Sequence, residues 1–190
     1  MYIRFLIAAA GALAAALVLA ACGGGKPAGA PTTTAPPPVS HAAPGLEALL
    51  PGTIDGQRLA KGSTTGAVVL AGRNAFSSAL RRILADSGKQ PPDLLFANAQ
   101  DPTGGLEVGV FRVRGLAAPA LRDAIVRSSR PNAPDLAVSR VVLGGTPVTK
   151  VVYPGGSTLY LYAHDGVVYY VGTQNEALAA RIVRRLRGVR

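Results

Sequence analysis

Residues 109–130 (GVFRVRGLAAPALRDAIVRSSR) align without gaps on residues 166–187 (GVVYYVGTQNEALAARIVRRLR), and nine of the 22 aligned positions are identical. Each copy begins with a β-rich run, continues through a glycine, and ends in a run whose apolar residues have helical spacing. The copies start 57 residues apart, so they predict a repeated unit of strand, strand and helix. Chance similarity between two Ala-, Val- and Arg-rich segments stays open as the alternative.

Further β-rich runs surround these copies and are separated by turn sequences such as Gly144-Gly145 and Asp165-Gly166. Because tight turns join antiparallel neighbours and single helices alternate with strand pairs, we expect an α+β fold. It would be a two-layer sandwich, with an antiparallel sheet of about seven or eight strands and three helices on one face. The expected strands are Gln57–Lys61, Ala67–Leu70, Leu94–Asn98, Leu106–Arg114, Ala137–Leu143, Val148–Tyr153, Thr158–Ala163 and Val167–Val171.

Three stretches carry apolar residues at the spacing of one helical face. They cover residues 76–84, 121–125 and 178–186. Asn175 precedes the third stretch, and its side chain is expected to accept a hydrogen bond from the first turn of that helix. These stretches supply the three helices of the expected fold.

A sheet covered by helices on one face leaves its other face open to a partner. A two-residue turn at Asp165-Gly166 places Tyr162 opposite Tyr169 on that face. Tyrosines combined with exposed arginines suit glycans, peptides or anionic polymers, through stacking and charge. The competing interpretation is structural, because tyrosine also stabilises cross-strand pairs. The predicted binding face comprises Tyr160, Tyr162, Tyr169, Arg112 and Arg114.

The last predicted helix is strongly basic and contains one acid, Glu176. Cations near a helix C-terminus complement the helix dipole, and a GC-rich genome also favours arginine. Alternatively, such a helix could lie against anionic headgroups or an anionic polymer. The predicted anionic-surface contact is Arg181, Arg184 and Arg185.

The N-terminus carries a short positive region with Arg4, a run of 17 uncharged residues, and then Leu19-Ala20-Ala21-Cys22. This sequence resembles the lipobox of bacterial lipoproteins, in which a Leu and two small residues precede a cysteine. The resemblance implies cleavage before Cys22 and transfer of diacylglycerol to its thiol, with palmitate as a fatty acid of the kind expected there. It also implies export and a lipid anchor at the outer face of the plasma membrane. The alternative is a plain signal peptide or an uncleaved anchor, with an incidental cysteine.

The chain divides into three parts by composition. Residues 1–21 are the predicted signal peptide. Residues 22–45 are rich in Pro, Gly, Ala and Thr, so we expect a disordered tether that begins at the lipidated Cys22. Residues 46–190 have the apolar content of one α+β globular domain.

The composition and motifs exclude several classes of site. A single cysteine excludes an internal disulfide and any multi-cysteine metal site, and only two histidines, His41 and His164, are present. The chain contains no G-x-S-x-G, P-loop or H-E-x-x-H motif, so we expect no metal, no cofactor and no enzyme activity. Export argues against a nucleic-acid partner, although the net charge of +10 would permit one.

These observations favour a lipid-anchored, exported envelope protein. Its domain would be a non-enzymatic binding or accessory module for an anionic wall polymer, headgroups or a protein partner. One alternative is a carrier that shelters a lipid or another apolar ligand between sheet and helices. A weaker one is a hydrolase that uses His164, although adjacent His164 and Asp165 would point to opposite faces of a strand.

Overall fold

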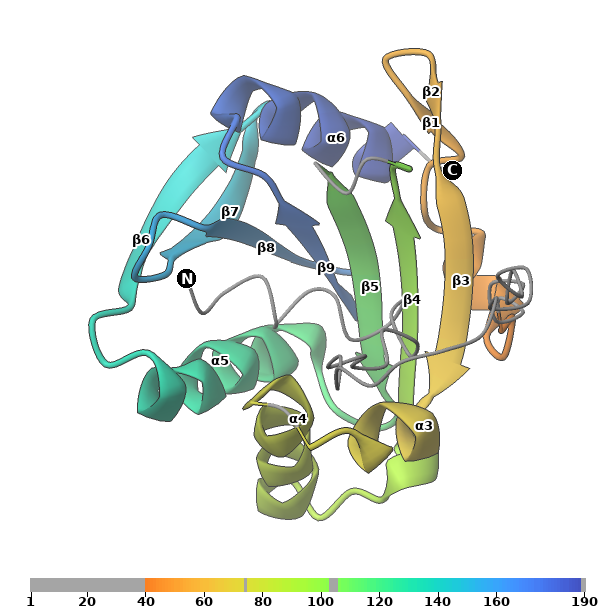
Figure 1. The fold of residues 1–190 in the computed structure, drawn as a ribbon, viewed down its shortest axis with the longest axis vertical. Helices are drawn as coiled ribbons and strands as arrows, with labels where there is room; N and C mark the ends of the chain where they lie inside the picture. Colours follow the sequence, from red (N-terminus) through yellow and green to blue (C-terminus); the bar gives the residue numbers. More distant parts are fainter. Residues whose placement is uncertain (1–39, 74, 103–105, 189–190) are drawn as a thin grey trace, which may run out of the picture.

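The computed structural model describes residues 40–73, 75–102 and 106–188. Their core is a seven-stranded antiparallel sheet with the strand order β3-β4-β5-β9-β8-β7-β6 (Figure 1). A separate two-stranded hairpin, β1-β2, precedes it in the chain. The predicted α+β class and the antiparallel sheet are therefore confirmed. The strands are β1 (Thr53–Ile54), β2 (Gln57–Arg58), β3 (Ala60–Thr65), β4 (Leu94–Gln100), β5 (Glu107–Val113), β6 (Ala137–Leu143), β7 (Thr146–Val152), β8 (Thr158–His164) and β9 (Val167–Gly172).

Five α-helices and two short 3-10 helices accompany these strands in the described ranges. The α-helices are α2 (Pro44–Glu47), α3 (Gly66–Ala71), α4 (Ala75–Asp86), α5 (Ala118–Ser129) and α6 (Glu176–Gly188). The 3-10 helices are η2 (Pro91–Asp93) and η3 (Arg130–Asn132). Within the described part of the chain, no helix is long and apolar enough to cross a membrane. The predicted signal peptide and Cys22 lie outside the described residues.

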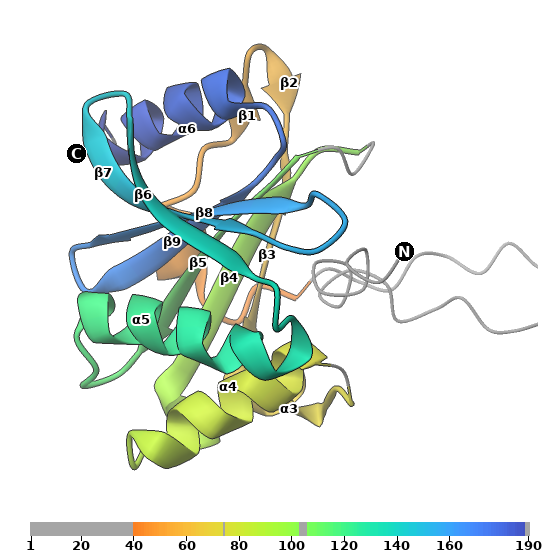
Figure 2. The ribbon, with the colours of Figure 1, turned by 90° about the vertical axis from the view of Figure 1, so that its left-hand side faces the viewer.

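Helices cover both faces of the sheet (Figure 2). On one face, α4 and α5 bury Leu80 and Leu121 against Phe111 of β5. On the other face, α6 buries Ile182 in a cluster with Val110 of the same strand. The prediction of three helices on one face is therefore wrong for α6. The physical reason is that the central strands are apolar on both sides, so each side must be covered.

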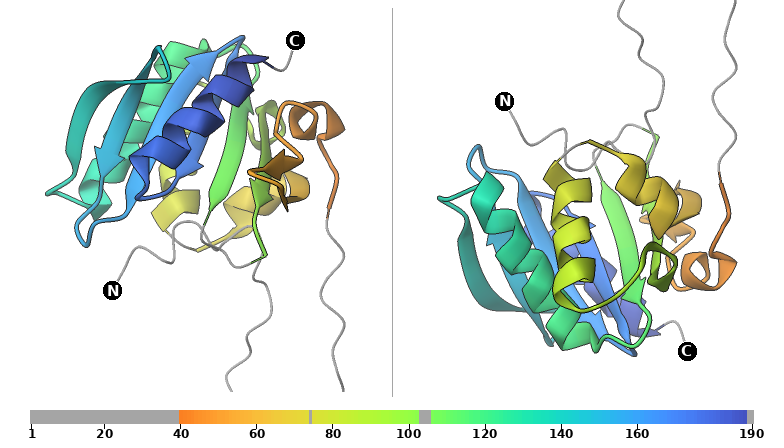
Figure 3. Two further views of the ribbon diagram at one scale, coloured as in Figure 1. Left: turned by 90° about the horizontal axis from the view of Figure 1, so that it is seen from above. Right: turned by 90° about the horizontal axis from the view of Figure 1, so that it is seen from below.

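The aligned stretches 109–130 and 166–187 both contain a strand followed by a helix. Their strands β5 and β9 are antiparallel neighbours in the sheet. However, α5 and α6 pack on opposite faces, as the two views of Figure 3 show. The structure therefore does not confirm a repeated three-dimensional unit of strand, strand and helix.

The hairpin of β8 and β9 has the register that the Asp165-Gly166 turn predicts. Tyr162 lies opposite Tyr169, and both turn residues have a positive φ, 47° at Asp165 and 74° at Gly166, as a two-residue type I′ turn requires. Tyr160 lies opposite Val171. The residues of the turn and the alternation of side chains along the two strands thus determine the register of the β8–β9 hairpin.

Residues 67–70, predicted as a strand, belong to helix α3 instead. The run is too short for the spacing of its apolar residues to distinguish a strand from a helix. The chain passes so close to η2 at Gly66 that a Cβ there would lie 2.1 Å from the Pro91 carbonyl oxygen. That close approach and the packing of α3 against α4 are tertiary contacts, which the local pattern does not contain.

The fold begins before Leu46, the start that composition indicates for the domain. The Ser63 N–H donates a hydrogen bond to the Ser40 carbonyl over 2.8 Å, and His41 forms a parallel bridge with Ser63. Residues 40–42 therefore continue the sheet along β3, its edge strand. This contact covers backbone groups that an edge strand otherwise exposes.

Candidate functional site

The predicted tyrosine face is not open. Tyr160, Tyr162 and Tyr169 are only 1%, 9% and 4% exposed, and they belong to the cluster that α6 covers. Burial raises the pKa of the Tyr169 hydroxyl, and nearby Asp165 raises it further. The prediction of these tyrosines as a binding face is therefore wrong, because a helix covers that side of the sheet. Arg112 and Arg114 are exposed as expected, but these tyrosines form no exposed platform beside them.

The second predicted site, on α6, is brought together with a distant segment of the chain. Asn175 caps this helix, since its side-chain oxygen accepts a hydrogen bond from the Leu178 N–H over 3.0 Å. Ile182, Val183 and Leu186 are buried against the sheet. The predicted arginines are exposed, and they lie beside the β1-β2 hairpin, next to α6 in the left panel of Figure 3.

An open groove of about 620 Å³ separates α6 from the loop and hairpin of residues 51–55. The helix contributes basic side chains to one wall, and the loop contributes mainly backbone and small side chains to the other. The groove therefore gathers all three residues that the sequence predicted as an anionic contact. Its lining residues are Pro51, Gly52, Thr53, Asp55, Arg181, Arg184 and Arg185.

The three arginines have different partners. Arg181 donates to one oxygen of Asp55, Oδ2, from Nη2 over 2.9 Å and from Nε over 3.3 Å. Arg185 donates from Nη1 to the Thr53 carbonyl oxygen over 2.8 Å. Among the described residues, no hydrogen bond or ion pair reaches the guanidinium of Arg184. Only Arg181 therefore has its charge balanced by an acid.

The Arg184 stem is held in place without a polar partner. It lies over the turn between β6 and β7, where a Cβ on Gly144 would approach Cγ of Arg184 to 2.4 Å. The glycine thus allows this close packing and has the positive φ of 56° that the turn needs. The guanidinium is left exposed at the groove, with its donors available to an anion.

A groove of this kind can bind phosphate or carboxylate groups. A guanidinium is planar and always charged, and its paired N–H groups match two oxygens of one anion. Three arginines and a single acid line the groove, so the groove carries excess positive charge. Asp55 is the acid in its lining.

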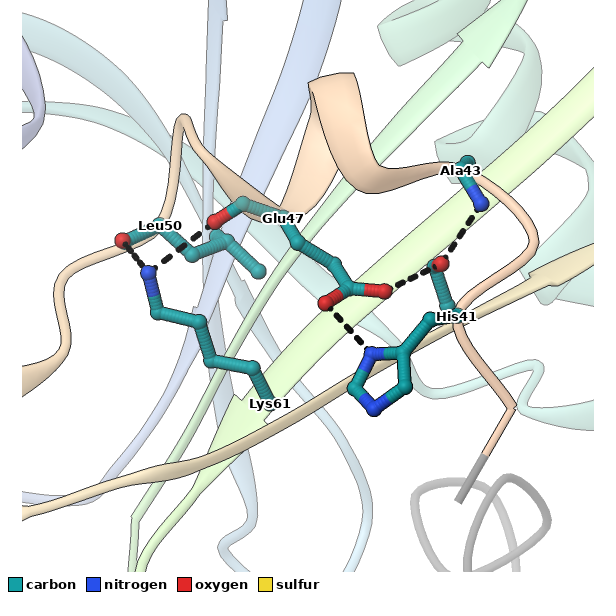
Figure 4. A network of polar contacts seen from close by, with 6 residues as sticks. His41, Ala43, Glu47, Leu50 and Lys61 are labelled. Carbon is teal, nitrogen blue, oxygen red and sulfur yellow. Dashed lines mark hydrogen bonds and ion pairs between the residues drawn. The ribbon is translucent and has the colours of Figure 1, made fainter.

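A separate polar network pins the start of the domain to β3 (Figure 4). The Glu47 carboxylate accepts hydrogen bonds from the Ser63 hydroxyl and, over 2.8 Å, from Nδ1 of His41. Lys61 donates to the carbonyl oxygens of Glu47 and Leu50 over 3.0 and 2.5 Å. Burial alone raises the pKa of Glu47, but the hydrogen bonds from Ser63 and His41 outweigh it and hold the pKa below its usual value.

This network has the residue types of a hydrolase but not the geometry of one. A histidine that activates a serine must contact its hydroxyl, whereas here Glu47 stands between His41 and Ser63. Ser63 is 4% exposed, and its hydroxyl oxygen also accepts from the Ala43 N–H. The prediction of a disordered tether over residues 22–45 is therefore wrong at His41, whose role is structural.

His164 also has a partner that the sequence did not predict. Its Nε2 lies 3.1 Å from Oδ2 of Asp165, although successive strand residues point to opposite faces. Asp165 lies beyond the end of β8 in the left-handed turn conformation, so strand alternation does not govern its side chain. Tyr162 stacks on the His164 ring with centroids 5.5 Å apart. Among the described residues, no three His, Cys, Asp or Glu side chains gather as a metal site.

Glu107 carries a buried carboxyl group that belongs to none of the sites predicted from the sequence. Glu107 is 5% exposed at the start of β5, and its Oε1 accepts a hydrogen bond from the Tyr170 hydroxyl. Asn98 lies 3.5 Å from the same oxygen, whereas Oε2 is buried and has no partner. Burial raises the pKa of Glu107 to about 7, against a smaller lowering by Tyr170 and Asn98. The sequence feature that could have indicated this buried acid is a glutamate within an otherwise apolar strand, LEVGVF (106–111).

No protein family model matches this chain, and no curated protein matches it. The basic groove beside α6, and not a likeness to a known protein, is therefore what indicates a function.

Proposed function

We propose that this protein is an exported lipoprotein, anchored through Cys22, whose domain binds an anionic component of the cell envelope without catalysis. The observation that supports this function is the unpaired guanidinium of Arg184 in an open groove that it shares with Arg185. Arg181, in the same groove, is paired with Asp55. Arg184 instead offers its donors to solvent.

A groove with two uncompensated arginines is suited to repeated weak contacts. Each basic residue close to an anionic surface contributes about 1 kcal/mol. One groove alone therefore gives modest affinity. Many anchored copies facing a polymer or a headgroup layer would raise the effective affinity, because later contacts form at high local concentration.

The test compares Arg184→Gln and Arg185→Gln with a matched arginine elsewhere. Arg127 aligns with Arg184 when residues 109–130 are placed on residues 166–187, is exposed on α5, and lies on the opposite face of the sheet. Arg127→Gln therefore changes the net charge equally without touching the groove. Co-sedimentation with an anionic envelope polymer, or with vesicles of anionic lipid, should weaken for the groove variants alone. Equal loss in all three variants would reduce the effect to net charge and contradict the proposal.

The anchor has its own test, independent of the groove. A fatty-acid probe fed to cells should label the wild-type protein and should not label Cys22→Ala. Cys22→Ala should also leave the membrane fraction. Label that persists in the variant would remove the lipoprotein part of the proposal and leave the groove untouched.

The carrier hypothesis gains no comparable support from the described residues. It requires an apolar cavity between sheet and helices. The groove instead opens beside α6 and is lined by charged side chains. The two helix–sheet interfaces contain buried apolar clusters.

A further inference from the structure

The geometry points to a sugar-phosphate or polyol-phosphate unit as the ligand of the groove, with its phosphate on Arg184 and Arg185 and a hydroxyl on Asp55. This inference rests on the proposed function and names the chemical class that the same groove selects. Asp55, the acid among the arginines of the groove, supports this ligand class.

Asp55 has one carboxylate oxygen in use and one available. Both hydrogen bonds from Arg181 end on Oδ2. No described residue donates to Oδ1, and the side chain is 48% exposed. A free carboxylate oxygen in a basic groove repels a second anion but accepts a hydrogen bond from a hydroxyl. It therefore discriminates against a ligand that carries charge alone.

The groups that would hold such a ligand line the same groove. Arg181 and its partner Asp55 stand one helical turn before Arg184 and Arg185, and side chains three or four positions apart on a helix have Cβ atoms about 5–6 Å apart. The free oxygen of Asp55 and the unpaired guanidinium of Arg184 are therefore offered to a ligand from two walls of one groove.

The backbone holds the Asp55 carboxylate where it is. Asp55 and Gly56 form a two-residue turn with φ of 50° and 81°, the type I′ geometry that a tight hairpin adopts. Arg181 and Arg185 tie this hairpin and the adjacent loop to α6 through Asp55 and the Thr53 carbonyl. The acceptor is thus positioned before a ligand arrives.

The experiment separates selection by Asp55 from charge attraction by the arginines. The full chain is titrated with poly(glycerol phosphate), which carries hydroxyls, and with inorganic polyphosphate of equal charge, which has none. A second arm compares vesicles containing phosphatidylglycerol with vesicles containing phosphatidic acid, and so distinguishes a polymer from a lipid headgroup as the source. The variants are Asp55→Asn, Asp55→Gly, Arg184→Gln and, as control, Arg127→Gln.

We expect the wild type to bind the hydroxyl-bearing member of at least one pair several-fold more tightly than its partner. Asp55→Gly should remove this preference and Asp55→Asn should reduce it, because the amide is a weaker acceptor than the carboxylate. Both variants should strengthen binding of polyphosphate, and glycine and asparagine both tolerate the positive φ of the turn. Arg184→Gln should weaken every interaction at least threefold, and Arg127→Gln none.

The two proposals fail in different ways. A wild type with no preference for hydroxyls, or Asp55 variants that keep the preference, would overturn the ligand class while leaving the anionic groove intact. An Arg184→Gln variant that binds like Arg127→Gln would overturn the groove itself. Thermal unfolding of each variant identifies any loss that comes from misfolding, and two different Asp55 replacements must agree for the inference to stand.

Discussion

The hydroxyl of Tyr170 donates a hydrogen bond to Oε1 of Glu107 over 2.5 Å, where both side chains are buried on the side of the sheet that α4 and α5 cover. The other oxygen of Glu107 has no partner. An ionised carboxylate in this position would be poorly solvated, so the fold favours the protonated acid. This pair makes the stability of the domain depend on pH.

Stability should fall as the pH rises from about 4.5 to about 7, the ordinary pKa of a glutamate and the raised pKa of Glu107. Between these two pH values, Glu107 stays protonated in the folded state and is ionised in the unfolded state. Its contribution to the free energy of unfolding is therefore complete below about pH 4.5 and is lost as the pH rises to about 7. The total loss is about 3 kcal/mol. Glu107→Gln should flatten this dependence, measured by urea unfolding at pH 5 and pH 8. An unchanged slope in the variant would contradict the assignment.

Gly109→Ala should destabilise the domain by about 1–3 kcal/mol or more, because the added Cβ would lie 2.1 Å from Cε1 of Tyr170. The tyrosine ring would have to move away from Glu107. Gly45→Ala is the matched control, since a Cβ there meets nothing within 4 Å. Thermal unfolding should lower the melting temperature of the first variant and leave that of the second within error.

Ser63→Ala should detach residues 40–50 from β3 and destabilise the domain by about 1–3 kcal/mol. It leaves the Ala43 N–H without its acceptor and Oε1 of Glu47 without the Ser63 donor, while Oε2 keeps its contact with His41. His41→Ala should have a smaller effect, because that side chain is 58% exposed. Limited proteolysis should cut near residue 45 faster in Ser63→Ala than in the wild type. Equal rates in all three proteins would remove the structural role of this network.

Asn175→Ala should lower stability by about 0.5–2 kcal/mol, since the Leu178 N–H loses its cap. The same change should weaken anion binding. Fraying at the start of α6 disturbs Arg181 first, and the charge of Asp55 is then no longer balanced in the groove. Asn175→Ser keeps a capping oxygen and should restore both properties. Circular dichroism and the polymer titration together check this; a serine variant as weak as the alanine variant would argue against a capping role.

Much of the local structure was predictable because it depends on neighbours in the chain. The β8–β9 register follows from the turn at Asp165-Gly166 and from alternation along both strands. The cap at Asn175 follows from its position before an apolar helical stripe. Residues 67–70 belong to a helix where the sequence predicts a strand, because a short apolar run does not show whether its period is that of a strand or of a helix.

The candidate site was predictable only in part. The basic face of α6 is visible as Arg181, Arg184 and Arg185 at helical spacing. The wall opposite was not predictable, because Asp55 meets Arg181 from 126 positions away. The buried pair of Glu107 and Tyr170 is likewise separated by 63 positions. No local pattern encodes such contacts.

By itself, the sequence determined most of the strands of the large sheet, the β8–β9 turn and the helices α4, α5 and α6, and it predicted the lipobox at Cys22. The tertiary structure decided that α6 covers the tyrosine side of the sheet, and so turned a predicted open face into core. It also decided that Arg184 stands unpaired at a groove while Arg181 is neutralised by Asp55. The physical reason is that alternation and helical spacing act over a few residues, whereas covering a face depends on which distant elements the sheet brings together.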